Sequence, residues 1–148
     1  MNNKTRALEA CKHKLSAQQK DQLQQIAQLN EALESEGKSS VGDKHETARA
    51  RIQSEIEKIG EQLKITEQHL SELPKLLESG SHKVQKGSLV STNRAVFFIG
   101  PPLGKIKSNS FEFYAISAAS PIGKLMMGKA KNTGFELNGI AYLIEEIA

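Results

Sequence analysis

Two acidic side chains in a short polar stretch of the chain are placed to share a cation. The stretch reads KSSVGDKHETAR at residues 38–49, and its acids are Asp43 and Glu46. On a helix, residues three apart have Cβ atoms about 5–6 Å from each other, so both carboxylates can face one ion. Mg²⁺ requires an octahedral set of oxygen ligands and usually shares them with a substrate or a partner. The pair therefore predicts half of a Mg²⁺ site, which another molecule completes.

The same pair also fits a purely local role at the start of a helix. An acid at the N-cap that is followed three residues later by Glu forms a capping box, and both charges favour the positive end of the helix dipole. Such capping contributes about 1 kcal/mol. Three basic neighbours are candidates to contact a phosphate or RNA, although ordinary surface salt bridges would explain them equally: Lys44, Arg49 and Arg51.

The residues on either side of this stretch have helical periodicity. Before it, the sequence contains no Pro or Gly between Lys4 and Glu36. The apolar residues of that segment follow one seam, which Gln19 and Gln22 interrupt: Leu8, Leu15, Ile26, Leu29 and Leu33. After it, a heptad repeat with alternating steps of four and three residues runs through Ile52, Ile56, Ile59, Leu63, Thr66, Leu70, Leu73 and Leu77.

Two such helices joined by a short polar turn predict an antiparallel coiled-coil hairpin over residues 1–79. The turn, near residues 42–46, would carry the two acids. Each arm of roughly 30 residues is about 45 Å long. Pro74 predicts an end or a kink in the second helix, with at most a short further turn over residues 75–78. Residues 80–86 are then expected to form a linker.

The sequence after residue 86 changes to the periodicity of strands. Turn residues bound three segments that are rich in β-branched or aromatic side chains, SLVST, AVFFI and FEFYAI. Asn138-Gly139, inside FELNGIAYLIEEI, predicts a hairpin with a type I′ turn. We therefore expect a small β-rich domain over residues 87–148 and an α+β fold overall.

The charge and the cysteine content limit the classes of partner. The formal net charge is only +3, but residues 83–148 hold eight Lys and Arg against four Asp and Glu. That surplus favours an acidic partner for the C-terminal domain. The single cysteine, Cys11, excludes an intramolecular disulfide and suits a reducing compartment. With no apolar run long enough to span a bilayer, the sequence predicts a cytoplasmic protein without a membrane partner.

Two motifs together resemble the Gre family of bacterial transcript cleavage factors. At the tip of their hairpin these factors carry Gly-Asp, two residues, and then Glu-Asn-Ala-Glu-Tyr. In this chain Gly42, Asp43, Glu46 and Ala48 match that motif in register. Their C-terminal motif runs from Ser-Pro-Ile through a Leu pair to Gly-Lys, and it corresponds here to SPIGKLMMGK at residues 120–129. The chain departs from the tip motif at three positions, with Thr47 in place of Asn, Arg49 in place of Glu and Ala50 in place of Tyr.

The resemblance implies a transcription elongation factor that is not itself an enzyme. Such a factor, here a monomer, binds bacterial RNA polymerase at its secondary channel and stimulates the polymerase to cleave backtracked RNA. Asp43 and Glu46 would help to hold a Mg²⁺ ion that is shared with the polymerase, beside the 3′ end of the nascent RNA, with DNA involved only indirectly. An FKBP-like C-terminal domain would dock on the polymerase through Ser120, Pro121, Ile122, Gly123, Lys124, Gly128 and Lys129.

Two other interpretations remain open from the sequence. A secondary-channel regulator that binds the polymerase without stimulating cleavage would have the same architecture, and only the altered tip residues would distinguish it. A plain coiled-coil interaction protein would use Asp43 and Glu46 as helix caps alone and would not depend on polymerase.

Overall fold

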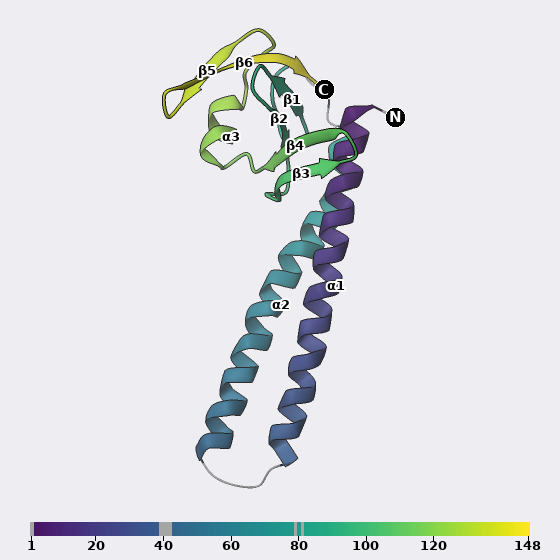
Figure 1. The fold of residues 1–148 in the computed structure, drawn as a ribbon, viewed down its shortest axis with the longest axis vertical. Coiled ribbons are helices and arrows are strands. Elements are labelled where there is room, and N and C mark those ends of the chain that lie inside the picture. The colour runs from purple at the N-terminus through teal and green to yellow at the C-terminus, as the bar shows by residue number, and fades with distance from the viewer. Residues whose placement is uncertain (1, 39–42, 79, 81) are drawn as a thin grey trace. The chain divides into compact units, whose positions relative to one another are not determined.

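The computed structural model describes residues 2–38, 43–78, 80 and 82–148, with the backbone alone at residues 37, 38 and 43–45. Two long helices come first, α1 (Asn3–Lys38) and α2 (Asp43–Leu77), and a strand-rich region follows them (Figure 1). Its elements are β1 (Leu89–Thr92), β2 (Val96–Ile99), β3 (Gly104–Ser108), β4 (Phe111–Ile116), α3 (Pro121–Met126), β5 (Gly134–Leu137) and β6 (Ile140–Ile147). The predicted α+β class is confirmed.

The chain divides into two compact units that cut across the two long helices. One unit comprises Leu15–Leu70, and the other comprises Met1–Lys14 together with Ser71–Ala148. The boundaries predicted from sequence separate helices from strands instead. The difference arises because the N-terminal end of α1 and the C-terminal end of α2 belong to the same compact unit as the sheet.

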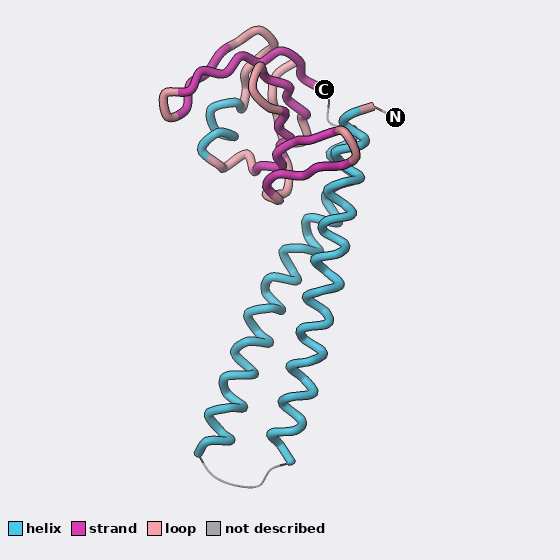
Figure 2. The backbone as a smooth tube through the Cα atoms, in the orientation of Figure 1, coloured by secondary structure: helices cyan, strands magenta, loops and turns pink. Residues whose placement is uncertain are grey.

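Within the Leu15–Leu70 unit, α1 and α2 lie side by side and run in opposite directions (Figure 2). The amide of Gln19 donates to the carboxylate of Glu67 across the pair, at 3.2 Å. The predicted seam faces inward: Ile59 is buried, whereas Ile26 and Leu63 are half-buried. The alternating apolar steps of the sequence therefore mark the helix–helix contact, as expected for a coiled coil.

The end of α2 departs from the prediction. The helix does not end at Pro74 but continues to Leu77, so the expected short further turn is present. Pro74 is three residues from the end, where it removes only the hydrogen bond that its own nitrogen would donate. Beyond Pro74 the heptad repeat predicts that Leu77 faces inward, but Leu76 is the buried residue. Leu76 is 7% exposed, whereas Leu77 is 50% exposed.

The sheet has six strands in the order β3-β4-β2-β1-β6-β5. All neighbouring pairs are antiparallel except β2 and β4, which are parallel. The β5–β6 hairpin turns at Asn138 and Gly139, whose φ angles of 52° and 79° are those of the predicted type I′ turn. A shift in register between Ser91 and Thr92 marks a β-bulge between β1 and β6.

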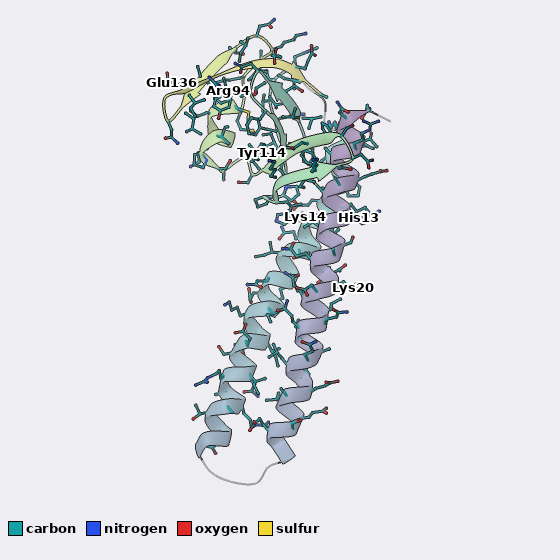
Figure 3. The ribbon with its side chains drawn as sticks, in the orientation of Figure 1. His13, Lys14, Lys20, Arg94, Tyr114 and Glu136 are labelled. Atoms are coloured by element: carbon teal, nitrogen blue, oxygen red, sulfur yellow. The ribbon has the colours of Figure 1, made fainter. Side chains whose placement is uncertain are left out.

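Both faces of the sheet are covered. On one face, α3 contributes Met126 to a buried cluster with Val84, Val90, Phe97, Ile99, Phe135 and Ile144. Phe98, Phe113 and Ala115 alternate with residues of that face along β2 and β4, and they are also buried. At Gly100, a Cβ would lie 3.3 Å from the Leu76 side chain of α2. The ammonium of Lys14 on α1 donates to the Leu103 carbonyl at 2.9 Å (Figure 3). The ends of the long helices therefore cover the second face of the sheet.

Cys11 belongs to this packed region, and its burial leads to a testable prediction. The side chain is 0% exposed, and burial raises the pKa of the thiol to about 12. Because the thiolate is the reactive form, we expect native protein at pH 8 to resist a thiol reagent that labels the unfolded chain within minutes. Unfolding in urea should release full labelling of one thiol per chain. Fast labelling of native protein would contradict the buried position.

The same shift predicts how stability depends on alkaline pH. The folded-state pKa of Cys11 lies above the ordinary thiol value, so the folded chain keeps its proton longer than the unfolded chain. The contribution of the buried thiol is therefore fully present below pH 9 and is lost as pH rises towards 12. Replacing Cys11 with Ala should remove this part of the alkaline loss, as urea unfolding at a series of pH values would measure.

Candidate functional site

The acidic pair lies at the start of α2. The helix begins at Asp43, so Asp43 and Glu46 are both in its first turn. Glu46 is exposed to solvent. Helix geometry therefore gives the pair the three-residue separation at which two Cβ atoms are about 5–6 Å apart. Gly42 lies outside the described residues, as do the side chains of Asp43 and Lys44, so the geometry of the carboxylate pair stays a prediction.

The two arginines that follow differ in their surroundings. Arg49 is half-buried, and its guanidinium donates a long hydrogen bond of 3.5 Å to the carbonyl of Leu33 on α1. Arg51 is exposed. Arg49 is therefore directed across the helix pair, whereas Arg51 faces solvent and can reach an approaching anion. The predicted RNA contacts of these residues stay predictions.

The described residues offer a metal ion too few ligands for a site of their own. Among them, no group of three or more His, Cys, Asp or Glu side chains is placed to hold a metal. Glu46 remains as one exposed carboxylate in the first turn of α2, where the dipole favours negative charge.

The segment SPIGKLMMGK forms α3 and its two ends. Ser120 is the N-cap of the helix: its hydroxyl accepts from the Gly123 N–H at 3.1 Å and donates to the Ser117 carbonyl at 2.7 Å. Pro121 occupies the first helical position, where a missing N–H costs nothing. Gly128 has a φ of 81°, which favours glycine after the helix. Much of this motif is therefore explained by the local fold.

Gly123 is the position of this segment with the least room for a side chain. A Cβ at this position would lie 2.2 Å from the Ser117 carbonyl oxygen and 2.8 Å from the Ser120 hydroxyl. Lys124, by contrast, is exposed, whereas Ile122 is half-buried against the core cluster and Lys129 is half-buried. Of the seven residues expected to dock on a partner, Lys124 is the one that presents its charge most openly.

The structure adds one arginine that sequence reasoning did not select. Arg94 is exposed after β1, donates to the Ala141 carbonyl at 2.6 Å, and lies 5.9 Å from the centre of the Tyr142 ring (Figure 3). Tyr142 in turn stacks on Phe135 at 4.9 Å. These contacts fix the orientation of a surface cation. The basic surplus of the C-terminal region was a signal for it, but the partners that hold it come from β6 and are distant in sequence.

No helix among the described residues is both long enough and apolar enough to cross a membrane. No protein family model matches this chain, and a search of curated proteins also finds no match. Among solved structures, the crystal structure of Gfh1 from Thermus aquaticus aligns over 94% of each chain, with 17% sequence identity and a TM-score of 0.35. The function proposed below rests on the residues of this chain itself.

Proposed function

We propose that this chain is a secondary-channel factor of bacterial RNA polymerase that stimulates cleavage of backtracked RNA. The observation that carries the proposal is the position of two acids, Asp43 and Glu46, in the first turn of α2, the second of two consecutive helices of 36 and 35 residues. The resemblance of the tip and of SPIGKLMMGK to the Gre family supports the same function. A helix pair of this length lets a small protein bring two carboxylates into a deep site.

The role of the tip residues follows from their charge and separation. Asp43 and Glu46 would supply carboxylate oxygens to a Mg²⁺ ion that the polymerase also holds, so neither protein needs a complete set of ligands. A bound metal of this kind lowers the pKa of a water molecule and stabilises the leaving oxygen. The chain contributes positioning and negative charge, and the polymerase carries out the hydrolysis.

The proposal is tested with stalled, backtracked complexes of the bacterial polymerase. We expect that adding the full-length chain accelerates the release of short 3′ RNA fragments and that the effect requires Mg²⁺. The complexes without the chain give the intrinsic rate. If the chain binds the polymerase and cleavage stays at the intrinsic rate, the cleavage function is wrong.

One observation favours a second candidate, a secondary-channel regulator that does not stimulate cleavage. Arg49 stands three residues after Glu46, where the Gre motif has Glu, and it is half-buried against α1. A positive charge at the position of a family acid makes this end of α2 less negative and so less attractive to a metal ion. Replacing Arg49 with Glu should then create or increase cleavage. A wild-type chain that alters RNA synthesis without any cleavage would support the regulator, and cleavage gained by Arg49→Glu would identify Arg49 as the residue that prevents it.

Docking is tested by reversing one exposed charge. Lys124 lies on α3 within the family-like segment, and we expect Lys124→Glu to weaken polymerase binding by about tenfold, because an interfacial like-charge contact costs more than the lost attraction. The matched control is Lys107→Glu, which reverses another exposed lysine on the edge strand β3. Equal affinities of the two variants, measured by titration against labelled polymerase, would argue against docking through α3.

A further inference from the structure

The inner seam of the helix pair contains a polar layer in the middle part of α1 and α2. Gln22 is 8% exposed, and its Oε1 atom has no hydrogen-bond partner among the described residues. Thr66, on α2, is 3% exposed. The hydrogen bond from Gln19 to Glu67 places these two stretches at the same level of the pair. A buried acceptor without a partner loses its hydration without compensation, so this layer holds the helices together less well than an apolar layer.

The same level of α2 also contains residues that favour the helical conformation weakly. Gly60 lies inside the helix, and apart from its chain neighbours and the surrounding helix backbone no described atom is within 4 Å of the position that its Cβ would occupy. Glycine is a poor helix former because its backbone loses the most freedom on folding. Six residues further on, the Thr66 hydroxyl donates to the Gln62 carbonyl at 3.1 Å. A threonine that bonds back to the preceding turn in this way weakens and often bends a helix.

The seam is apolar on both sides of this level. Towards the start of α2 it consists of Ile52, Ile56 and the buried Ile59. Towards the other end it consists of Leu70 on α2, which is half-buried, and Leu15 on α1, which is fully buried. The unpaired Oε1 atom of Gln22 therefore lies at the same level as Gly60 and Thr66, which are within two turns of each other on α2. The weak packing and the weak helix propensity are confined to this level.

We propose that the middle of the helix pair is a hinge, formed by residues 60–66 of α2 and residues 19–23 of α1. At this level the two helices separate and bend while the apolar seams on either side stay closed. The part of the pair that carries the acids can then tilt without unfolding. This inference depends on the packing of the helix pair alone, and it holds whether or not the chain binds polymerase.

Hydrogen–deuterium exchange of the full chain, followed by mass spectrometry, tests the hinge. We expect amides of residues 60–66 to exchange about tenfold faster than those of residues 53–59 and 67–73, which makes a local maximum along α2. Gly60→Ala should slow exchange at residues 60–66 about fivefold, because Ala is the better helix former by that factor. Gln22→Leu should slow exchange at residues 60–66 and also at residues 19–23, because it replaces the orphaned amide with an apolar group.

The matched control is Ser54→Ala, which improves helix propensity at an exposed position of α2 outside the hinge. It should leave exchange at residues 60–66 unchanged. Exchange that rises steadily along α2 without a maximum at residues 60–66 would overturn the proposal. An equal slowing by Ser54→Ala and Gly60→Ala would also overturn it, since the helix would then open as a whole.

Discussion

Glu46→Gln should reduce stimulated RNA cleavage by about a hundredfold or more and leave polymerase binding nearly unchanged. The substitution preserves the size of the side chain and removes one of the two proposed anionic ligands. Even ligand-supporting groups around metal sites commonly contribute 10–100-fold to affinity or activity, so loss of a direct ligand should cost at least about as much. Gln is nearly as good a helix former as Glu, so folding should change by less than about 1 kcal/mol. Cleavage rates over a Mg²⁺ titration would measure the effect.

Asp43→Asn should behave in the same way, because Asn preserves the size of the Asp side chain and removes its charge. The matched control is Glu55→Gln, which removes an exposed acid further along α2. If Glu55→Gln lowers cleavage as much as Glu46→Gln does, general charge on the hairpin explains the effect. If all three variants cleave at the wild-type rate across Mg²⁺ concentrations, the acids only cap the helix and the metal role is wrong.

Gly123→Ala should destabilise the sheet-containing unit by about 3 kcal/mol, at the upper end of the usual cost of overpacking. The new methyl group would meet the Ser117 backbone oxygen at 2.2 Å, and a backbone atom cannot move aside as a flexible side chain can. The readout is specific, because the chain has no Trp and its two Tyr residues, Tyr114 and Tyr142, both belong to the sheet. Tyrosine fluorescence during urea unfolding therefore follows this unit, whereas far-UV circular dichroism mainly follows the helices.

Two substitutions in the same helix calibrate this prediction. Ser120→Ala removes the N-cap and should cost about 1 kcal/mol. Lys124→Ala changes an exposed position to a better helix former and should be close to neutral. A Gly123→Ala protein that unfolds at the wild-type urea concentration would show that the Ser117–Gly123 approach is not a constraint on the fold.

Local periodicity explains how much of the fold could be predicted. The steps of four and three residues predict the helix pair, and Asn138-Gly139 predicts the β5–β6 hairpin, because both signals depend on neighbours in sequence. The parallel pairing of β2 with β4 had no such signal, since it joins strands that are separated by β3. The burial of Leu76 in place of Leu77 was also not predictable, because it depends on how α2 continues past Pro74.

The candidate site shows the same division. The acidic pair is visible in sequence because a three-residue spacing is itself local. The approach of Arg49 to Leu33 joins two helices, and the support of Arg94 by Ala141 and Tyr142 joins β6 to the turn after β1, so neither had a sequence signal. The segment SPIGKLMMGK is distinctive in sequence, but the cap at Ser120 and the close approach at Gly123 account for part of its composition.

The inclusion of the helix ends in the core of the sheet unit has a consequence for protein engineering. Leu76 packs near Gly100, and the Lys14 ammonium donates a hydrogen bond to the Leu103 carbonyl. A chimaera that joins this sheet to another hairpin at residues 80–86 would lose both contacts and leave an apolar face of the sheet uncovered. Exchange points at Lys14 and Ser71 preserve that face. Between them, paired insertions of one heptad in each arm keep the seam in phase and lengthen the arms by about 10 Å per step. The same sheet unit can therefore be kept unchanged in a series of proteins whose hairpins differ in length by one heptad at a time.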